Sequence, residues 1–197
     1  MGGRFKPLLP FGDRTIVETC IGNLQHAGIT EIIVVIGHRA DEMRRELGHS
    51  SVRFAVNEKV ESEMSDSIRC GICEISKDAG AVLIALCDQP AVPASAIREI
   101  VHAWQGERST LVVPQWKEQT GHPVLIDLNS WRNELMHLDP QKGLRALFDT
   151  YLDRVRRISV ASPYVTRDID TWLDYWALYE EIFGCPPPVD EMCADEG

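Results

Sequence analysis

The sequence has little that would suit a membrane or a nucleic acid. No apolar run approaches the roughly 18 residues that cross a bilayer, and no signal peptide is visible. Basic residues are scarce: 20 Lys and Arg stand against 30 Asp and Glu, which gives a net charge of −10. No basic block is interleaved with aromatic residues. We therefore expect a cytoplasmic protein that has neither a membrane nor a nucleic acid as its partner.

Cysteines are also too few and too scattered to staple a chain of 197 residues, so we expect reduced thiols. Cys70 and Cys73 form a C-x-x-C motif, which is typical of redox and zinc sites. However, Ile68, Ile72 and Ile75 recur around them at helical spacing, and a second pair of zinc ligands is absent. The pattern favours two cysteines inside a helix.

Short apolar runs alternate with amphipathic segments along the whole chain. Expected strands cover residues 31–37, 52–56, 81–86, 109–114, 122–127 and 155–160, and expected helices cover 39–47, 65–76, 96–104 (with Ser95 as its cap), 130–135, 141–151 and 171–183. Because the strands are apolar throughout, the pattern predicts an α/β fold: a three-layer, doubly wound, mostly parallel sheet covered on both faces.

Polar residues follow several of these strands, at the edge where such sheets bind their ligands. Asp88 comes after "VLIAL", Gly37 and His38 follow "EIIVVI", and Asn57 follows "VRFAV". A carboxylate placed after a buried strand is costly unless it has a partner. Asp88 therefore either caps the turn that begins at Pro90 or holds a cation.

Several segments, in this order, resemble the MobA-like nucleotidyltransferases, which include the molybdenum-cofactor cytidylyl- and guanylyltransferases. They are "MGGRFKPLLPFGDRTIVE", "AGITEIIVVIGH", "VNEKVESEMSDSI", "VLIALCDQPAV", "VVPQWKEQTGHPVLID" and "DIDTWLDYWAL". The resemblance runs from Met1 to about Tyr179 and implies a nucleotide-diphospho-sugar transferase (Rossmann-like) fold. It also implies Mg²⁺-dependent transfer of a nucleotide from CTP or GTP to a phosphorylated, molybdopterin-like acceptor, with release of pyrophosphate.

The family pattern opens with a strand and a Leu-Ala-Ala-Gly-x-Ser-x-Arg-Met-Gly loop, whereas this sequence starts at the Met-Gly. The resemblance thus implies a domain over residues 1–183 that is N-terminally incomplete, followed by a Pro-rich acidic tail over residues 184–197. We expect the central first strand to be missing and its place to be an open apolar slot. Whether Met1 is the true start stays open.

The resemblance assigns Asp88 to Mg²⁺, and Asp168 as the second ligand. Asp170 is the alternative ligand and is also a candidate N-cap for the last helix. Lys6 would neutralise charge on the α-phosphate as pyrophosphate leaves. Three positions depart from the family pattern: Glu63 and Cys87 replace glycines, and Trp172 replaces a proline.

The resemblance further places Gly2, Gly3 and Arg4 against the phosphates. Asn57, Ser65 and Ser67 would contact the base and sugar, although the serines alone could simply cap a helix. Gly121, His122 and Pro123 would line the acceptor side, or merely form a turn before a strand. His122 is not expected to act as a general base, because a phosphate acceptor is already ionised near pH 7.

Two other functions fit the same sequence. One is an inactive nucleotide-binding or scaffold module, left by loss of the first strand. The other is a sugar-phosphate nucleotidylyltransferase, which uses the same chemistry on a different acceptor. The sequence leaves open the base of the NTP, the acceptor and the oligomeric state.

Overall fold

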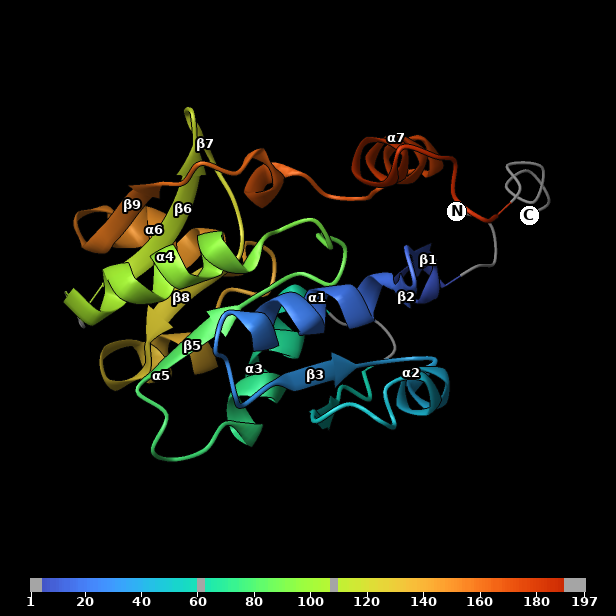
Figure 1. Ribbon diagram of the computed structural model, residues 1–197. Helices are drawn as coiled ribbons and strands as arrows, with labels where there is room; N and C mark the ends of the chain where they lie inside the picture. The colour runs from blue at the N-terminus through green and yellow to red at the C-terminus, as the bar shows by residue number, and fades with distance from the viewer. Residues whose placement is uncertain (1–4, 60–62, 107–109, 190–197) are drawn as a thin grey trace.

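The computed structural model describes residues 5–59, 63–106 and 110–189, and it has helices on both faces of a central sheet (Figure 1). The strands are β1 (Pro10–Phe11), β2 (Arg14–Thr15), β3 (Ile33–Ile36), β4 (Arg53–Val56), β5 (Ala81–Ile84), β6 (Leu111–Trp116), β7 (Gln119–Thr120), β8 (Val124–Asp127) and β9 (Val155–Ser159). The α-helices are α1 (Ile16–His26), α2 (Ala40–Glu46), α3 (Met64–Glu74), α4 (Ala94–Gly106), α5 (Leu128–Met136), α6 (Leu144–Thr150) and α7 (Trp172–Phe183).

The strand directions confirm the predicted mixed α/β fold with a mostly parallel sheet. Strands β3 and β4 pair in parallel, and so do β6 and β9. Strand β8 lies between β5 and β6 and is antiparallel to both, so β5 and β6 run the same way. Strand β7 pairs antiparallel with the end of β6. The carboxyl ends of the parallel strands are the edge at which we expected the site.

The expected helices and strands are found at nearly the expected places. Cys70 and Cys73 both lie in α3, as the isoleucine spacing predicted. The prediction for Ser95 is wrong. Helix α4 begins at Ala94, and the Pro93 carbonyl accepts the N–H groups of Ala96 and Ile97, so Ser95 lies inside the first turn.

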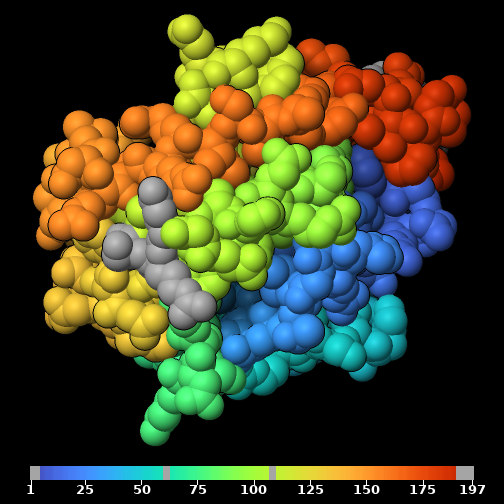
Figure 2. Space-filling view, turned by 60° about the vertical axis from the view of Figure 1, so that its left-hand side comes forward, coloured from blue at the N-terminus to red at the C-terminus, as the bar shows by residue number. Residues whose placement is uncertain are grey.

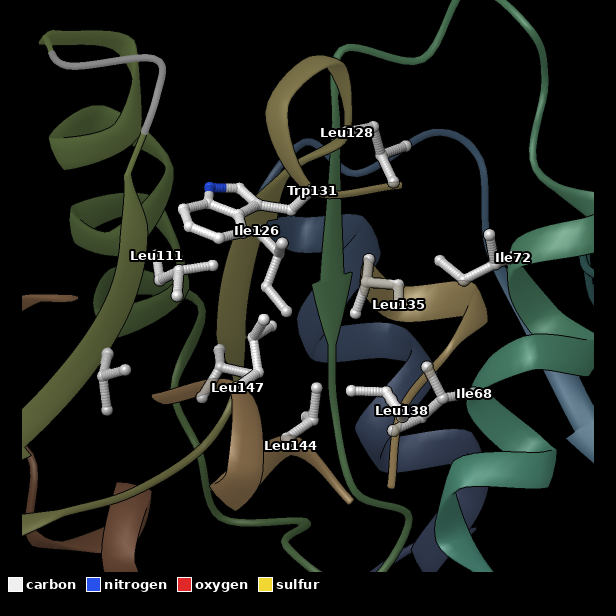
Figure 3. Packing of buried hydrophobic residues seen from close by; sticks show 12 residues of the cluster. Ile68, Ile72, Leu111, Ile126, Leu128, Trp131, Leu135, Leu138, Leu144 and Leu147 are labelled. Atoms are coloured by element: carbon white, nitrogen blue, oxygen red, sulfur yellow. The ribbon is translucent and has the colours of Figure 1, made fainter. Parts of the chain in front are cut away.

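The largest hydrophobic cluster packs α3, α5 and α6 against β6 and β8 (Figure 3). Its buried members are Ile68, Ile72, Leu111, Val113, Val124, Ile126, Leu128, Trp131, Leu135, Leu138, Leu144 and Leu147. Asp127, which is almost fully buried, ends β8 and caps α5 by accepting the Ser130 N–H at 3.0 Å. This cluster fixes β8 and β5 beneath the carboxyl-terminal edge.

A second cluster ties α7 to the start of the chain. The Phe11 ring packs edge-on against Tyr179 and Phe183, and the Tyr175 hydroxyl donates to the Pro10 carbonyl at 2.7 Å. Val189 packs on the same cluster, so part of the expected tail lies against the domain, and residues 190–197 lie outside the described residues. The segment before α7 is thereby held close to the segment after Phe5.

The described part of the chain supplies no strand between β3 and β5. An apolar cavity of about 600 Å³ lies there, walled by the two strands and by side chains of α1 and α3. Helices α1 and α4 are neighbours on the surface of the molecule (Figure 2) and lie over one face of the sheet (Figure 1). No helix among the described residues has the length and apolar character needed to cross a membrane.

Candidate active site

Two consecutive residues, Phe5 and Lys6, bridge the carboxyl ends of β3 and β5. The Arg39 guanidinium, three residues after β3, lies 4.7 Å from the centre of the Phe5 ring. The Lys6 ammonium donates at 3.0 Å to the carboxylate of Asp88, four residues after β5. Both strands therefore point their carboxyl ends at one place, as the fold class predicted.

Lys6 lies among oxygens from two distant segments. Its Nζ atom is 3.0 Å from Asp88 Oδ2, 2.7 Å from the Ile169 carbonyl oxygen and 3.7 Å from Asp170 Oδ1. The Lys6 and Asp88 side chains are largely shielded from water, with exposed fractions of 27% and 21%. These three contacts fix the Lys6 ammonium beside Asp88.

Residues 168–170 are joined to the loop after β5. The Ile169 N–H donates to the Asp88 carbonyl at 3.0 Å, and the Gln89 side-chain amide donates to the Asp168 carboxylate. The structure thus brings both predicted metal ligands into one region. Gln89 was not among the predicted site residues, although it binds the Asp168 carboxylate. Its position directly after Asp88 is the sequence signal that could have indicated a role in the site.

Asp170 does not cap the last helix. The N-cap of α7 is Thr171, whose hydroxyl accepts the Asp174 N–H at 3.1 Å while the Asp174 carboxylate accepts the Thr171 N–H at 2.7 Å. This reciprocal pair leaves the Asp170 side chain free to approach Lys6. Asp170 therefore stays a candidate metal ligand beside Asp168.

One oxygen of the Asp88 carboxylate makes no hydrogen bond within the described chain. Oδ2 accepts from Lys6, while Oδ1 is buried and has no hydrogen-bond partner among the described residues. No three His, Cys, Asp or Glu side chains converge into a metal cage in the described ranges. A hard cation such as Mg²⁺ needs only one or two protein carboxylates when phosphate oxygens and water complete its shell. These residues fit that type of site.

His122 lies two residues before β8, with Asp88 and Asp168 in electrostatic range. Burial lowers the pKa of His122 below its ordinary value of 6.5, and the charges of Asp168 and Asp88 oppose that shift only in part. The imidazole is therefore neutral at pH 7. It adds no charge to the acceptor side predicted for Gly121, His122 and Pro123.

This lowered pKa predicts a pH dependence of stability. Because the unfolded state binds the His122 proton more tightly, the contribution is fully present above pH 6.5 and falls as the pH drops below that value. In metal-free protein, the free energy of unfolding of the wild type should fall more steeply than that of His122→Gln between about pH 7.5 and 5.5. Parallel slopes in urea titrations of the two proteins would contradict this prediction.

Gly121 is packed against the backbone of Val165. A Cβ atom at residue 121 would lie 1.9 Å from the Val165 carbonyl oxygen, and the His122 N–H donates to that same oxygen at 2.8 Å. We expect Gly121→Ala to destabilise the fold by about 1–3 kcal/mol or more, because backbone must move. Gly106→Ala is the matched control, since its Cβ would meet only Arg156 at 3.8 Å; equal melting temperatures would refute the prediction.

The residues predicted to contact the base and the sugar differ in the contacts that they make within the chain. The Asn57 side-chain NH₂ group donates to the Ser67 hydroxyl at 3.2 Å. The side-chain oxygen of Asn57 accepts the Lys59 N–H at 3.2 Å. Asn57 therefore joins the loop after β4 to α3. Ser65 is fully buried and its hydroxyl has no partner among the described residues. Gly2, Gly3 and Arg4, predicted for the phosphates, lie outside the described residues.

Two thiols lie near Asp88. Desolvation by the surrounding protein raises the pKa of Cys87, although the residue is exposed by surface area, and the Asp88 charge adds to the shift; burial raises the pKa of the half-buried Cys20. Both thiols are therefore protonated at pH 7 and are poor nucleophiles. Cys87, which stands where the family pattern has glycine, lines the cavity between β3 and β5 together with Ser67.

Comparison with known proteins gives one family. The family model described as MobA-like NTP transferase domain matches residues 1–155, which include Lys6, Asp88 and His122. Residues 168–170 lie beyond that match.

Solved structures agree with the family match. Rv0371c from Mycobacterium tuberculosis H37Rv is 28% identical, with a TM-score of 0.81 and 90% of each chain covered, and it has also been crystallised as a complex with manganese. A nucleotidyl transferase from Methanothermobacter thermautotroptrophicus (Mth528) is 26% identical, with a TM-score of 0.78 over 91% of this chain and 85% of that one.

Curated relatives are matched over only part of their length. Nicotine blue oxidoreductase from Paenarthrobacter nicotinovorans is 29% identical over 133 residues, which is 62% of this chain and 62% of that protein. Bifunctional GlmU proteins are matched over 24% and 32% of their length.

Proposed function

The chain belongs to the MobA-like NTP transferase family, and on that premise we propose that it moves a nucleoside monophosphate from an NTP to a small phosphorylated acceptor. One observation carries the proposal. The Asp88 carboxylate, after the central strand β5, binds Lys6 through Oδ2 and keeps a buried Oδ1 without a partner. A buried carboxylate oxygen without a partner is costly, so its retention favours a ligand that comes from outside the chain.

In the proposed reaction an oxygen of the acceptor phosphate attacks the α-phosphorus of the NTP. A new bond forms between that oxygen and the α-phosphorus, the bond from the α-phosphorus to the bridging oxygen breaks, and pyrophosphate leaves with the electron pair. No proton has to be removed from the acceptor, which agrees with a neutral His122 that takes no part as a base. Catalysis then rests on positioning and on charge neutralisation.

Lys6 and two of the carboxylates have roles in this scheme. Lys6, held by Asp88 and the Ile169 carbonyl, would neutralise charge at the α-phosphate. Asp88 and one of Asp168 and Asp170 would hold Mg²⁺. The ion, when bound, supplies positive charge to the triphosphate oxygens.

We further propose CTP or GTP as donor and a molybdopterin-like phosphate as acceptor. Both the donor and the acceptor follow from the family resemblance. A sugar phosphate is the competing acceptor, because the same transfer chemistry serves it, and it is therefore kept in the test.

The test begins with a thermal-shift panel of the four NTPs, each with Mg²⁺ and with Mn²⁺. A nucleotide at 100 times its Kd adds about 2.7 kcal/mol of stability, which for a chain of this size raises the melting temperature by about 5–10 °C. One or two NTPs should give this shift, and only with a divalent cation.

Pyrophosphate release then separates the alternatives. Release that depends on an added phosphorylated acceptor supports the transferase, and comparison of molybdopterin-type with sugar-phosphate acceptors identifies the class. A nucleotide-dependent shift without any release would instead identify the non-catalytic nucleotide-binding module. No shift with any NTP would refute both.

A further inference from the structure

Arg39 has an unusual backbone conformation at the ligand edge of the sheet. It is the N-cap of α2, which follows the carboxyl end of β3 (Figure 1), and its φ of 70° and ψ of 24° lie in the left-handed region. Glycine and asparagine adopt this conformation more readily than arginine. The Arg39 side chain makes no capping hydrogen bond to the helix. Neither backbone geometry nor capping therefore favours an arginine at this position.

Glu42 holds the Arg39 guanidinium in one orientation. The Nε atom of Arg39 donates to Glu42 Oε1 at 2.7 Å, and its Nη2 atom donates to Oε2 at 2.6 Å. These hydrogen bonds lower the pKa of Glu42 below its ordinary value of 4.5, so the carboxylate is ionised at pH 7. A planar guanidinium that is bound at two points has little freedom to rotate.

The guanidinium lies over the Phe5 ring. Its central carbon is 4.7 Å from the ring centre, which is within the range of cation–π attraction. Phe5 directly precedes Lys6, and its carbonyl accepts the Leu8 N–H at 2.9 Å in a short 3₁₀ turn. The Lys6 ammonium in turn donates to Asp88. A chain of contacts therefore runs from α2 to the carboxylate proposed for the metal.

We propose that Arg39 is a positioning residue for nucleotide transfer: through the Phe5 ring it fixes the backbone at Lys6, so that the ammonium stays beside Asp88. This inference rests on the proposed function, because it concerns the same site. In this role Arg39 does not touch the nucleotide. A displacement of about 1 Å can lower a rate by about 100-fold, so a contact outside the site is sufficient to affect transfer.

The first readout is the affinity of the nucleotide-free protein for Mn²⁺, measured by calorimetry. The Lys6 ammonium occupies oxygens that would otherwise bind a divalent cation, so this affinity reports how firmly the ammonium is held. Arg39→Met removes the guanidinium, and Phe5→Leu removes the ring but keeps an apolar side chain. In both variants Mn²⁺ should bind about 2 to 5 times more tightly, the range of one partly exposed cation–π contact.

Two controls separate positioning from charge. Arg44→Met removes a positive charge from the same helix, where Arg44 Nη1 lies 3.5 Å from Asp41 Oδ1, and should leave Mn²⁺ affinity unchanged. In a Lys6→Met background, Arg39→Met should have no further effect, because no ammonium is left to position. An equal tightening in Arg44→Met, or an equal effect of Arg39→Met with and without Lys6, would overturn the proposal.

Acceptor-dependent pyrophosphate release is the second readout. It should fall by about 10-fold in Arg39→Met, in kcat more than in the KM for the NTP, because a displaced ammonium no longer stabilises the transition state. If the wild type released no pyrophosphate, the proposed transfer would fail, whereas the Mn²⁺ comparison would still decide the role of Arg39. Arg39→Gly takes the place of Arg39→Met if the latter does not fold, since glycine adopts the left-handed backbone without strain. Unchanged Mn²⁺ affinity in that variant would refute the positioning role.

Discussion

Replacing Asp88 by asparagine is expected to lower the rate of acceptor-dependent pyrophosphate release by at least about 100-fold to 1,000-fold. Asparagine keeps the size of the side chain and can still accept from Lys6, but it removes the charge that a divalent cation needs. The side chain lies at the ligand edge of the sheet rather than in a hydrophobic cluster. The melting temperature of the nucleotide-free protein should therefore change little.

Asp168→Asn and Asp170→Asn are the matched controls. The resemblance favours Asp168 as the second ligand, whereas the structure places Asp170 3.7 Å from the Lys6 ammonium and Asp168 in a hydrogen bond with Gln89. Only the variant of the true second ligand should raise the Mn²⁺ concentration needed for activity. An Asp88→Asn protein with activity within a few-fold of the wild type would remove Asp88 from the site altogether.

Much of the fold could be predicted from the sequence because its strands and helices carry clear apolar patterns. The run Ala81–Ile84 is apolar throughout and is indeed a central strand, and α7 covers nearly all of the predicted range. Errors arose where two neighbouring residues could play the same role. Ser95 failed as a cap because the helix begins one residue earlier, at Ala94, and the Pro93 carbonyl accepts the first helical N–H groups.

The helix start at α7 shows the same limit. Asp170 and Thr171 are both good N-cap residues, and propensity cannot choose between them. Asp174 decides, because it lies three residues after Thr171 and completes a capping box with it. Because Thr171 caps the helix, the Asp170 carboxylate remains available to the site. The identity of the N-cap residue therefore also bears on the second metal ligand.

Long-range contacts were beyond sequence reasoning. Lys6 meets Asp88 and Ile169 across separations of 82 and 163 residues, and only the folded chain brings them together. The family resemblance pointed to Lys6 and Asp88 as partners of one ligand. It gave no reason to expect that the lysine would lie among oxygens of the chain itself.

That position predicts two opposite effects of Lys6→Met. The Lys6 ammonium lies beside two carboxylates and a carbonyl, which are also the groups that attract a divalent cation, so lysine and metal compete in the nucleotide-free protein. Without this charge, Mn²⁺ should bind about 5 to 30 times more tightly, which corresponds to about 1–2 kcal/mol of binding free energy. The rate of transfer should nevertheless fall by about 100-fold to 1,000-fold, because charge developing at the α-phosphate loses its partner.

Lys6→Arg separates charge from shape. It keeps a positive group near Asp88, so Mn²⁺ affinity measured by calorimetry should stay close to that of the wild type. Its planar guanidinium cannot take the place of a compact ammonium between Asp88 and Ile169, so the rate should still fall. If Lys6→Met lost both metal affinity and rate, the lysine would be supporting the metal site rather than competing for it. An unchanged rate in Lys6→Met would show that the ammonium, although fixed beside Asp88, neutralises nothing in the reaction.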